Sequence, residues 1–254
     1  MPSFDKRRGR NSGGIYTGAS AGKSKERFSM TMKQHNSSAF GAWEYDRRIT
    51  TVIPYYMDMC AQILDLAAAF SFEKPNWLDT GCGTGTLVQM AQERFPDASF
   101  TLCDPSQEML CITARRLANK GYSFFCIPSQ EMDFIEEFDI VTAVFAHHYL
   151  SLEQRKQAVS RCCSALKKGG VFISFENVLP NSKAGKTAGL KRWAYFQQQK
   201  GRKKEEIRAH LQRMNQQVFP ITLKQQTAIL QECGFKTVEL LWASYMQAGL
   251  YAVK

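Results

Sequence analysis

The sequence lacks three features that would place the protein in a membrane or outside the cell. No apolar run approaches the roughly 20 residues that a membrane-spanning helix requires. The basic N-terminus has no apolar segment of the kind found in secretory signals. The eight cysteines include no Cys-x-x-Cys pair, and most stand in apolar runs, which favours reduced, buried thiols over disulfides or a zinc site. We therefore expect a cytoplasmic protein with no metal site and no membrane partner.

Acidic residues are scarce in two segments whose net charges, +5 and +8, together exceed the +10 of the whole chain. Residues 1–27 hold seven Lys or Arg against two acids, and residues 183–213 hold ten against two. Such segments suit phosphate or another anion, although a solvated tail and a solvated helix face explain them equally well. Residues 1–36 also combine many Gly and Ser with few apolar side chains, which predicts a disordered basic tail.

A loop with three glycines organises the rest of the chain. The run Trp77–Leu87 reads WLDTGCGTGTL, so an apolar stretch ends in Asp79 and the glycines follow at positions 81, 83 and 85. Glycines permit positive φ and let a ligand approach the backbone closely. A dinucleotide fingerprint requires G-x-G-x-x-G, and an acid beside a pyrophosphate is unfavourable, so a cationic ligand fits better. An ordinary loop between a strand and a helix is the alternative.

Strand and helix patterns alternate from residue 75 onward. Expected strands cover 76–79, 98–103, 124–127, 138–145, 171–175, 235–242 and 245–253, with helices at 84–94, 106–117, 152–166 and 221–233 between them. The alternation predicts an α/β fold with a doubly wound, seven-stranded, mostly parallel sheet. We divide the chain into the tail (1–36), a helical cap (37–72) and a sheet domain (73–254) with a helical insertion at 180–219, after the fifth strand.

The order D-x-G-x-G-x-G, followed by a second strand that ends in Asp104, resembles the class I S-adenosylmethionine (SAM) methyltransferases. The resemblance implies that SAM is the cofactor and that the loop packs on its methionine part. It also implies that Asp79 holds the cationic end and that Asp104 holds the ribose hydroxyls. The cofactor contacts implied in this way are Asp79, Gly81, Cys82, Gly83, Gly85, Asp104, Pro105, Met109, Ser129, Gln130 and Phe145.

The candidates on the acceptor side are the adjacent His147, His148 and Tyr149, together with Tyr56 and Arg213. Methyl transfer needs mainly alignment of donor and acceptor, and a general base only if the acceptor must lose a proton. His147 follows the fourth strand, where a histidine is also compatible with plain packing. We expect residues 40–57 and the insertion 180–219 to form a lid that selects an acceptor with an apolar part and an anionic part. Tyr56 and Arg213 are the polar contacts expected from that lid.

Two further segments resemble the carboxy-SAM synthases, which act in tRNA wobble-uridine modification. They are Trp43–Tyr56, with WEYDRRI and IPYY, and Ala228–Phe235, with AILQECGF. The arginine that holds the extra carboxylate in that family corresponds to Leu211 in an ungapped match, with Arg208 and Arg213 nearby. We therefore expect a SAM-dependent methyltransferase with a small-molecule or RNA acceptor. A carboxy-SAM synthase-like enzyme with a tRNA-related role and a non-catalytic RNA-binding protein are the alternatives. The insertion is expected to form a homodimer arm.

Overall fold

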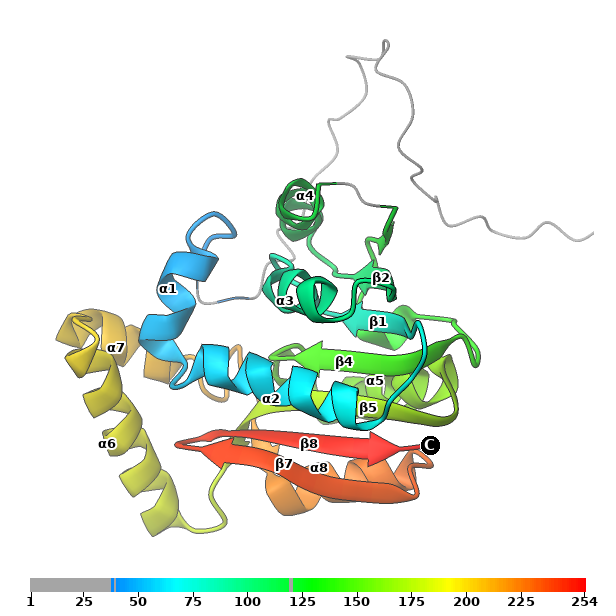
Figure 1. Cartoon of the computed structure of the whole chain (residues 1–254). Helices are drawn as coiled ribbons and strands as arrows, with labels where there is room; N and C mark the ends of the chain where they lie inside the picture. The colour runs from blue at the N-terminus through cyan, green and yellow to red at the C-terminus, as the bar shows by residue number, and fades with distance from the viewer. Residues whose placement is uncertain (1–37, 39, 119–120) are drawn as a thin grey trace, which may run out of the picture.

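A computed structural model describes residues 38, 40–118 and 121–254, so the expected tail at 1–36 lies outside the described residues. Its centre is one sheet with the strand order β3-β2-β1-β4-β5-β8-β7, in which short β6 pairs with β5 (Figure 1). Strands β1 to β5 run parallel, and β8 runs antiparallel to both β5 and β7. The strands are β1 (Asn76–Thr80), β2 (Ser99–Cys103), β3 (Ser123–Phe125), β4 (Phe138–Val144), β5 (Leu166–Leu179), β6 (Ile221–Thr222), β7 (Thr237–Ser244) and β8 (Gln247–Val253). The predicted doubly wound, mostly parallel sheet is thus confirmed, and β6 is a two-residue addition to it.

The helices form two layers and a group at one end of the sheet. Helices α2, α3 and α4 cover one face, α5 and α8 cover the other, and α1, α6 and α7 lie beyond the carboxyl ends of the parallel strands (Figure 1). The helices are α1 (Tyr45–Val52), α2 (Tyr56–Ala69), α3 (Thr86–Arg94), α4 (Gln107–Arg116), α5 (Leu152–Ala165), α6 (Lys183–Gln199), α7 (Lys204–Gln212) and α8 (Leu223–Glu232). No helix in the described part of the chain is long and apolar enough to cross a membrane.

The period-two alternation of the strands assigns each side chain to one of the two cores. In β1, Trp77 packs in the cluster beneath α2 and α3, whereas the next residue, Leu78, packs beneath α5 and α8. In β4, Ile140 and Val141 divide in the same way. Both faces of the sheet are therefore buried, and the strand ends remain as the place for a site.

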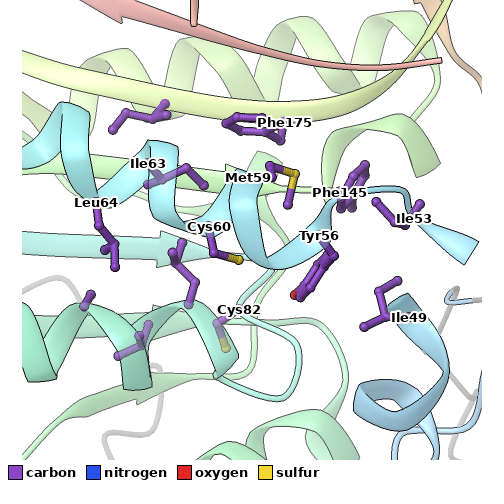
Figure 2. Close-up of a cluster of buried hydrophobic side chains, with 14 of the residues drawn as sticks. Ile49, Ile53, Tyr56, Met59, Cys60, Ile63, Leu64, Cys82, Phe145 and Phe175 are labelled. Carbon is purple, nitrogen blue, oxygen red and sulfur yellow. The ribbon is translucent and has the colours of Figure 1, made fainter. Parts of the chain in front are cut away.

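Helix α2 differs from the cap that the sequence predicted at 37–72. Its apolar stripe, which includes Met59, Cys60 and Ile63, packs against the face of the sheet (Figure 2). The chain changes direction before it at Tyr55, whose φ of 57° lies in the left-handed region. Only the segment up to this turn lies at the mouth of the sheet, because the stripe of α2 needs an apolar surface to cover it.

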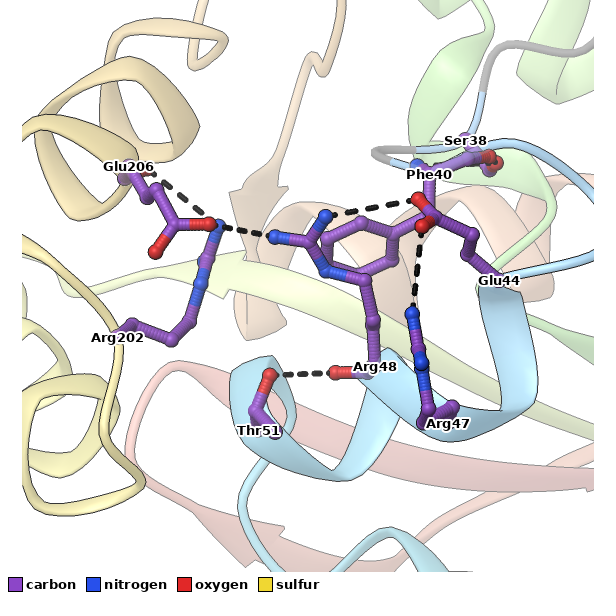
Figure 3. Close-up of polar contacts among 8 residues, drawn as sticks. All are labelled: Ser38, Phe40, Glu44, Arg47, Arg48, Thr51, Arg202 and Glu206. Atoms are coloured by element: carbon purple, nitrogen blue, oxygen red, sulfur yellow. Dashed lines mark hydrogen bonds and ion pairs between the residues drawn. The ribbon is translucent and has the colours of Figure 1, made fainter.

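Helix α1 is attached to the glycine loop and to the insertion. Asp46 accepts hydrogen bonds from the hydroxyls of Thr84, at 2.6 Å, and Thr86, at 3.1 Å. On the other side Arg48 donates to Oε1 of Glu206 at 2.6 Å, as Figure 3 shows. The cap segment and the insertion thus form one covering over the carboxyl ends of β4 and β5.

Candidate active site at the carboxyl ends of the strands

A cavity of about 690 Å³ opens at the carboxyl ends of β1, β2 and β4. Its size lies within the range of sites that hold a cofactor-sized molecule, and its place is where ligands bind in open α/β sheets. Most of the predicted cofactor contacts line this cavity, namely Gly81, Gly83, Asp104, Pro105, Met109, Ser129, Gln130 and Phe145. The structure therefore brings together residues from four separate loops.

The glycine loop presents backbone to the cavity. Gly81 has a φ of +70°, and a Cβ at this position would lie 2.4 Å from the Cβ of Ala146. Gly83 also has a positive φ, and its N–H donates to Oδ2 of Asp104 at 2.9 Å. A side chain at either glycine would strain the loop, and a side chain at position 81 would also collide with the loop that follows β4.

Asp104 is held by two backbone amides. Besides the bond from Gly83, its Oδ1 accepts from the N–H of Ser106 at 2.8 Å. Ser106 is in turn the N-cap of α4, and its hydroxyl accepts from the N–H of Met109 at 3.3 Å. Burial raises the pKa of Asp104 to about 6, although the two amides lower it. The carboxylate is thus fixed at the cavity wall with lone pairs left for a ligand.

Asp79 stands behind the cavity wall instead of lining it. It is 3% exposed, and its Oδ1 accepts from the hydroxyl of Thr142 at 2.6 Å. Burial raises the pKa of Asp79 to about 7, the Thr142 bond lowers it, and the neighbouring charge of Asp104 raises it. A cationic ligand in the cavity would favour the ionised form of both carboxyls.

The turn after β3 supplies two polar side chains with different surroundings. The hydroxyl of Ser129 lies 2.7 Å from that of Thr80, so this side chain is already engaged. Oε1 of Gln130 is buried without a hydrogen-bond partner. A buried amide oxygen without a hydrogen-bond donor costs free energy, so a ligand that donates a hydrogen bond at this end of the cavity would satisfy Oε1 of Gln130.

Two of the predicted cofactor contacts have other environments. Cys82 points into the core beneath α2 (Figure 2), where burial raises the pKa of its thiol. Gly85 begins α3, and a Cβ there would lie 2.7 Å from Cγ2 of Thr113. Both residues shape the loop, but neither lines the cavity.

A second cavity of about 30 Å³ adjoins the first beneath α1 and α7. Tyr45, Phe145 and Tyr149 line both cavities and so form the wall between them. The polar lining unique to the smaller cavity comes from His148, Asn177, His210 and Arg213. The sequence did not single out Tyr45, although it stands in the aromatic segment that the lid was expected to use.

The adjacent histidines after β4 have opposite environments. His147, the predicted catalytic residue, is fully buried, and neither ring nitrogen has a hydrogen-bond partner. Its ring stacks on Phe172, 6.2 Å away between centroids, and burial lowers its pKa to about 4. His148 lines the second cavity, and its Nδ1 lies 2.7 Å from Oε2 of Glu176. The structure thus places His147, the predicted catalytic residue, in the core, and it places His148 at the second cavity.

Glu176, at the carboxyl end of β5, was not predicted as a site residue. Its two oxygens accept from the backbone N–H of His147, at 2.9 Å, and of His148, at 3.0 Å, in addition to the His148 ring. Burial opposes its ionisation, yet these interactions with His148, together with His147 and Arg155, bring the pKa of Glu176 below its ordinary value. An acid at the end of a strand next to the site was the signal that sequence reasoning could have used.

The structure places the other two acceptor-side candidates, Tyr56 and Arg213, in different environments. Tyr56 is buried between α2 and the loop that carries Cys82 (Figure 2), and it lines neither cavity, so the structure places it in the core. Arg213 lines the second cavity. Burial raises the pKa of the Tyr149 hydroxyl, although the guanidinium of Arg213, which is hydrogen-bonded to that hydroxyl, lowers it. Arg213 therefore brings a positive charge to the wall between the cavities.

Comparisons with known proteins agree with this geometry. Residues 78–170 match the family described as a methyltransferase domain. The carboxy-SAM synthase of Helicobacter hepaticus is 26% identical over 223 residues, which cover 84% of this chain and 92% of that protein. The synthase of Staphylococcus epidermidis is 23% identical over 214 residues, with 83% and 92% covered.

Solved structures share the fold at lower identity. Magnesium protoporphyrin IX methyltransferase from Synechocystis with bound SAM superposes with a TM-score of 0.58 at 15% identity, covering 86% of this chain and 92% of that one. Human N-acetylserotonin methyltransferase in complex with SAM gives 0.55 at 14% identity, with 77% and 51% covered. The chain therefore shares the fold of these two methyltransferases.

Proposed function

We propose a methyl-transfer reaction for this chain, which matches a methyltransferase domain over residues 78–170 and is a distant homologue of the carboxy-SAM synthases over most of its length. The protein transfers the methyl group of SAM to a small molecule with an apolar body and an anionic group. The observation that carries the proposal is the larger cavity, which is sized for SAM, with a smaller cavity beside it beneath α1 and α7.

The residues of the larger cavity fit SAM part by part. The fixed carboxylate of Asp104 has lone pairs for the two ribose hydroxyls. The unpartnered Oε1 of Gln130 suits the adenine amino group, and the buried thioether of Met109 suits its ring face. Backbone at Gly81 and Gly83 receives the methionine part, with the charge of Asp79 behind it. SAM supplies the activated methyl group, so these residues serve to bind and orient.

The smaller cavity supports the acceptor side of the proposal. Phe145 and the aromatic rings of Tyr45 and Tyr149 offer apolar contact, and Arg213 offers a cation. Its roof is the joined covering of α1 and α7, which the bond from Arg48 to Glu206 holds closed (Figure 3). A cavity of about 30 Å³ is too small for an acceptor, so α1 and α7 must move apart for one to enter, and a small molecule needs less opening than a base within an RNA chain.

Asp104→Ala tests the SAM site. Removal of the carboxylate leaves the ribose hydroxyls unpaired in a buried site, which costs about 1–3 kcal/mol or about 5- to 150-fold in affinity. Calorimetry with SAM measures this loss, and exposed Asp133→Ala is the matched control. Unchanged affinity in Asp104→Ala, or a preference of the wild-type protein for NAD over SAM, would overturn the proposal.

The long similarity to carboxy-SAM synthases supports a second candidate, in which the bound nucleoside carries an extra carboxylate. Arg213, which lines the smaller cavity and bonds Tyr149 of the wall, is the cation nearest to where we expect that group. Mass spectrometry of the small molecule that copurifies with the protein distinguishes the two. Carboxy-SAM in the site would favour the synthase-like reaction, and SAM or S-adenosylhomocysteine would favour methyl transfer.

A further inference from the structure

A buried histidine–carboxylate pair stands at the second cavity, and methyl-group alignment alone does not require it. His148 and Glu176 each have side chains that are 2% exposed, and Nδ1 and Oε2 are 2.7 Å apart. The backbone N–H groups of residues 147 and 148 fix the same carboxylate. Because an ionised carboxylate can only accept, Nδ1 of His148 must donate to it. The ring is then oriented, and Nε2 is the nitrogen left for a second substrate.

The position of the ring matches that role. His148 lines the second cavity, and its ring lies 4.3 Å from that of Tyr149 and 5.7 Å from that of Phe145 between centroids. Both of these neighbours also line the larger cavity. The pair is therefore next to the wall across which an acceptor would meet the methyl group. The titratable or charged groups around His148 are Glu176 and Arg155 behind it, the adjacent His147 and Tyr149, Tyr45 from α1, and His210 and Arg213 from the α7 end.

We propose that His148, held by Glu176, is the general base of the reaction and that the acceptor atom is a hydroxyl oxygen. The inference rests on the proposed function and specifies its acceptor. The acceptor O–H gives its proton to Nε2 of His148 while an oxygen lone pair forms a bond to the methyl carbon of SAM. The C–S bond breaks, its electron pair stays on sulfur, and the imidazolium later releases the proton to solvent. His148 is the catalytic residue, and Glu176 is a positioning residue.

A hydroxyl is the acceptor that benefits most from this arrangement. An alcohol or phenol is protonated near neutral pH and is a poor nucleophile until a base removes the proton. An aromatic thiol ionises without help, so a fixed base would add little to its reactivity. Loss of the buried pair should therefore slow methyl transfer to an oxygen acceptor much more than methyl transfer to a sulfur acceptor.

Nitrogen-15 NMR of protein labelled at its four histidines tests the ring state without any acceptor. At mildly alkaline pH we expect the His148 ring to carry its proton on Nδ1 and none on Nε2. Glu176→Gln should remove this preference, because a Gln amide can donate as well as accept, so Nδ1 of His148 no longer has to be the donor. A proton on Nε2 of His148 in the wild-type protein would overturn the proposal, whatever the transfer assays show.

Transfer of a labelled methyl group to 4-hydroxybenzoate and to 4-mercaptobenzoate tests the base itself. His148→Gln should lower transfer to the hydroxyl probe about 100-fold or more and transfer to the thiol probe far less, with SAM affinity unchanged. His147→Gln, at a ring without hydrogen bonds, is the matched control and should affect neither probe. Equal losses on both probes in His148→Gln would overturn the proposal. If the wild-type protein binds SAM and methylates neither probe, the proposed acceptor class fails, and the NMR result alone decides the state of the His148–Glu176 pair.

Discussion

The indole N–H of Trp193 donates to the backbone carbonyl of Val52 at 2.6 Å, and this bond joins the insertion to the cap segment across 141 residues of sequence. Trp193 is 2% exposed, so the bond is protected from water. With the ion pair between Arg48 and Glu206 it fixes α6 and α7 against α1. The roof of the second cavity therefore depends on contacts that the sheet does not supply.

Trp193→Phe should loosen this roof. The substitution keeps an aromatic ring and leaves the buried Val52 carbonyl without its donor, which costs about 1–3 kcal/mol of stability. We expect a higher KM for 4-hydroxybenzoate and an unchanged Kd for SAM, since neither Trp193 nor Val52 lines the larger cavity. Steady-state kinetics and calorimetry measure the two quantities. Tyr195→Phe, exposed on the same helix, is the control, and an equal loss of SAM affinity in Trp193→Phe would contradict this account.

Arg213→Ala should affect the acceptor and not the cofactor. The guanidinium lines the second cavity and bonds Tyr149, whereas Arg208, five residues earlier, is exposed. Loss of a charge-assisted contact predicts a rise in the KM for 4-hydroxybenzoate of about 10-fold or more. Arg208→Ala should leave the KM unchanged. The assignment of Arg213 to the acceptor would be wrong if the two variants behaved alike.

The fold and most of the larger cavity could be predicted because their signals are local. Strand alternation and the glycine spacing place Gly81, Gly83 and Asp104 at the ends of neighbouring parallel strands, and parallel strands end at the same edge. N-capping of α4 by Ser106 also depends only on adjacent residues. Such features need no knowledge of distant packing.

The acceptor side could not be predicted in the same way. His147 and His148 share one short turn, and only the position of Glu176 on β5 determines which ring faces the cavity. Tyr56 and Tyr45 lie on either side of the turn at Tyr55, which directs α2 into the core and leaves α1 at the mouth. These choices depend on contacts between distant segments, which no local pattern records.

Gly81→Ala tests the close approach of the glycine loop. A Cβ at this position would lie 2.4 Å from the Cβ of Ala146, and the positive φ adds strain of about 1–2 kcal/mol. We expect a lower Tm and a loss of SAM affinity, measured by scanning fluorimetry and calorimetry. Gly41→Ala, where a Cβ meets nothing within 4 Å, should change neither. A Gly81→Ala protein with wild-type affinity would show that the loop backbone does not contact SAM.

Asp79 links the stability of the free protein to its affinity for SAM. Burial raises its pKa from 3.8 to about 7, so the folded state holds a proton that the unfolded chain has lost over this interval. Its contribution to stability is therefore complete below pH about 4, declines as the pH rises, and is lost above about 7. His147 and His210, whose pKa values burial lowers to about 4 and about 3, act with the opposite sign. Only the difference between the wild-type protein and a variant isolates Asp79.

Asp79→Asn keeps the shape of the side chain and an acceptor for the Thr142 hydroxyl but cannot ionise. Relative to wild type, the free variant should gain stability as the pH rises from about 4 to above 7, because no buried charge forms. Its affinity for SAM should be weaker, and the increase of wild-type affinity over the same pH interval should become smaller, because the anion behind the cavity wall, close to the cationic ligand, is gone. Scanning fluorimetry across pH, with and without SAM, measures both effects. A variant that stays less stable than wild type at every pH, or that keeps the full SAM-induced shift in Tm, would show that Asp79 is a packing residue and not the counter-charge of the cofactor.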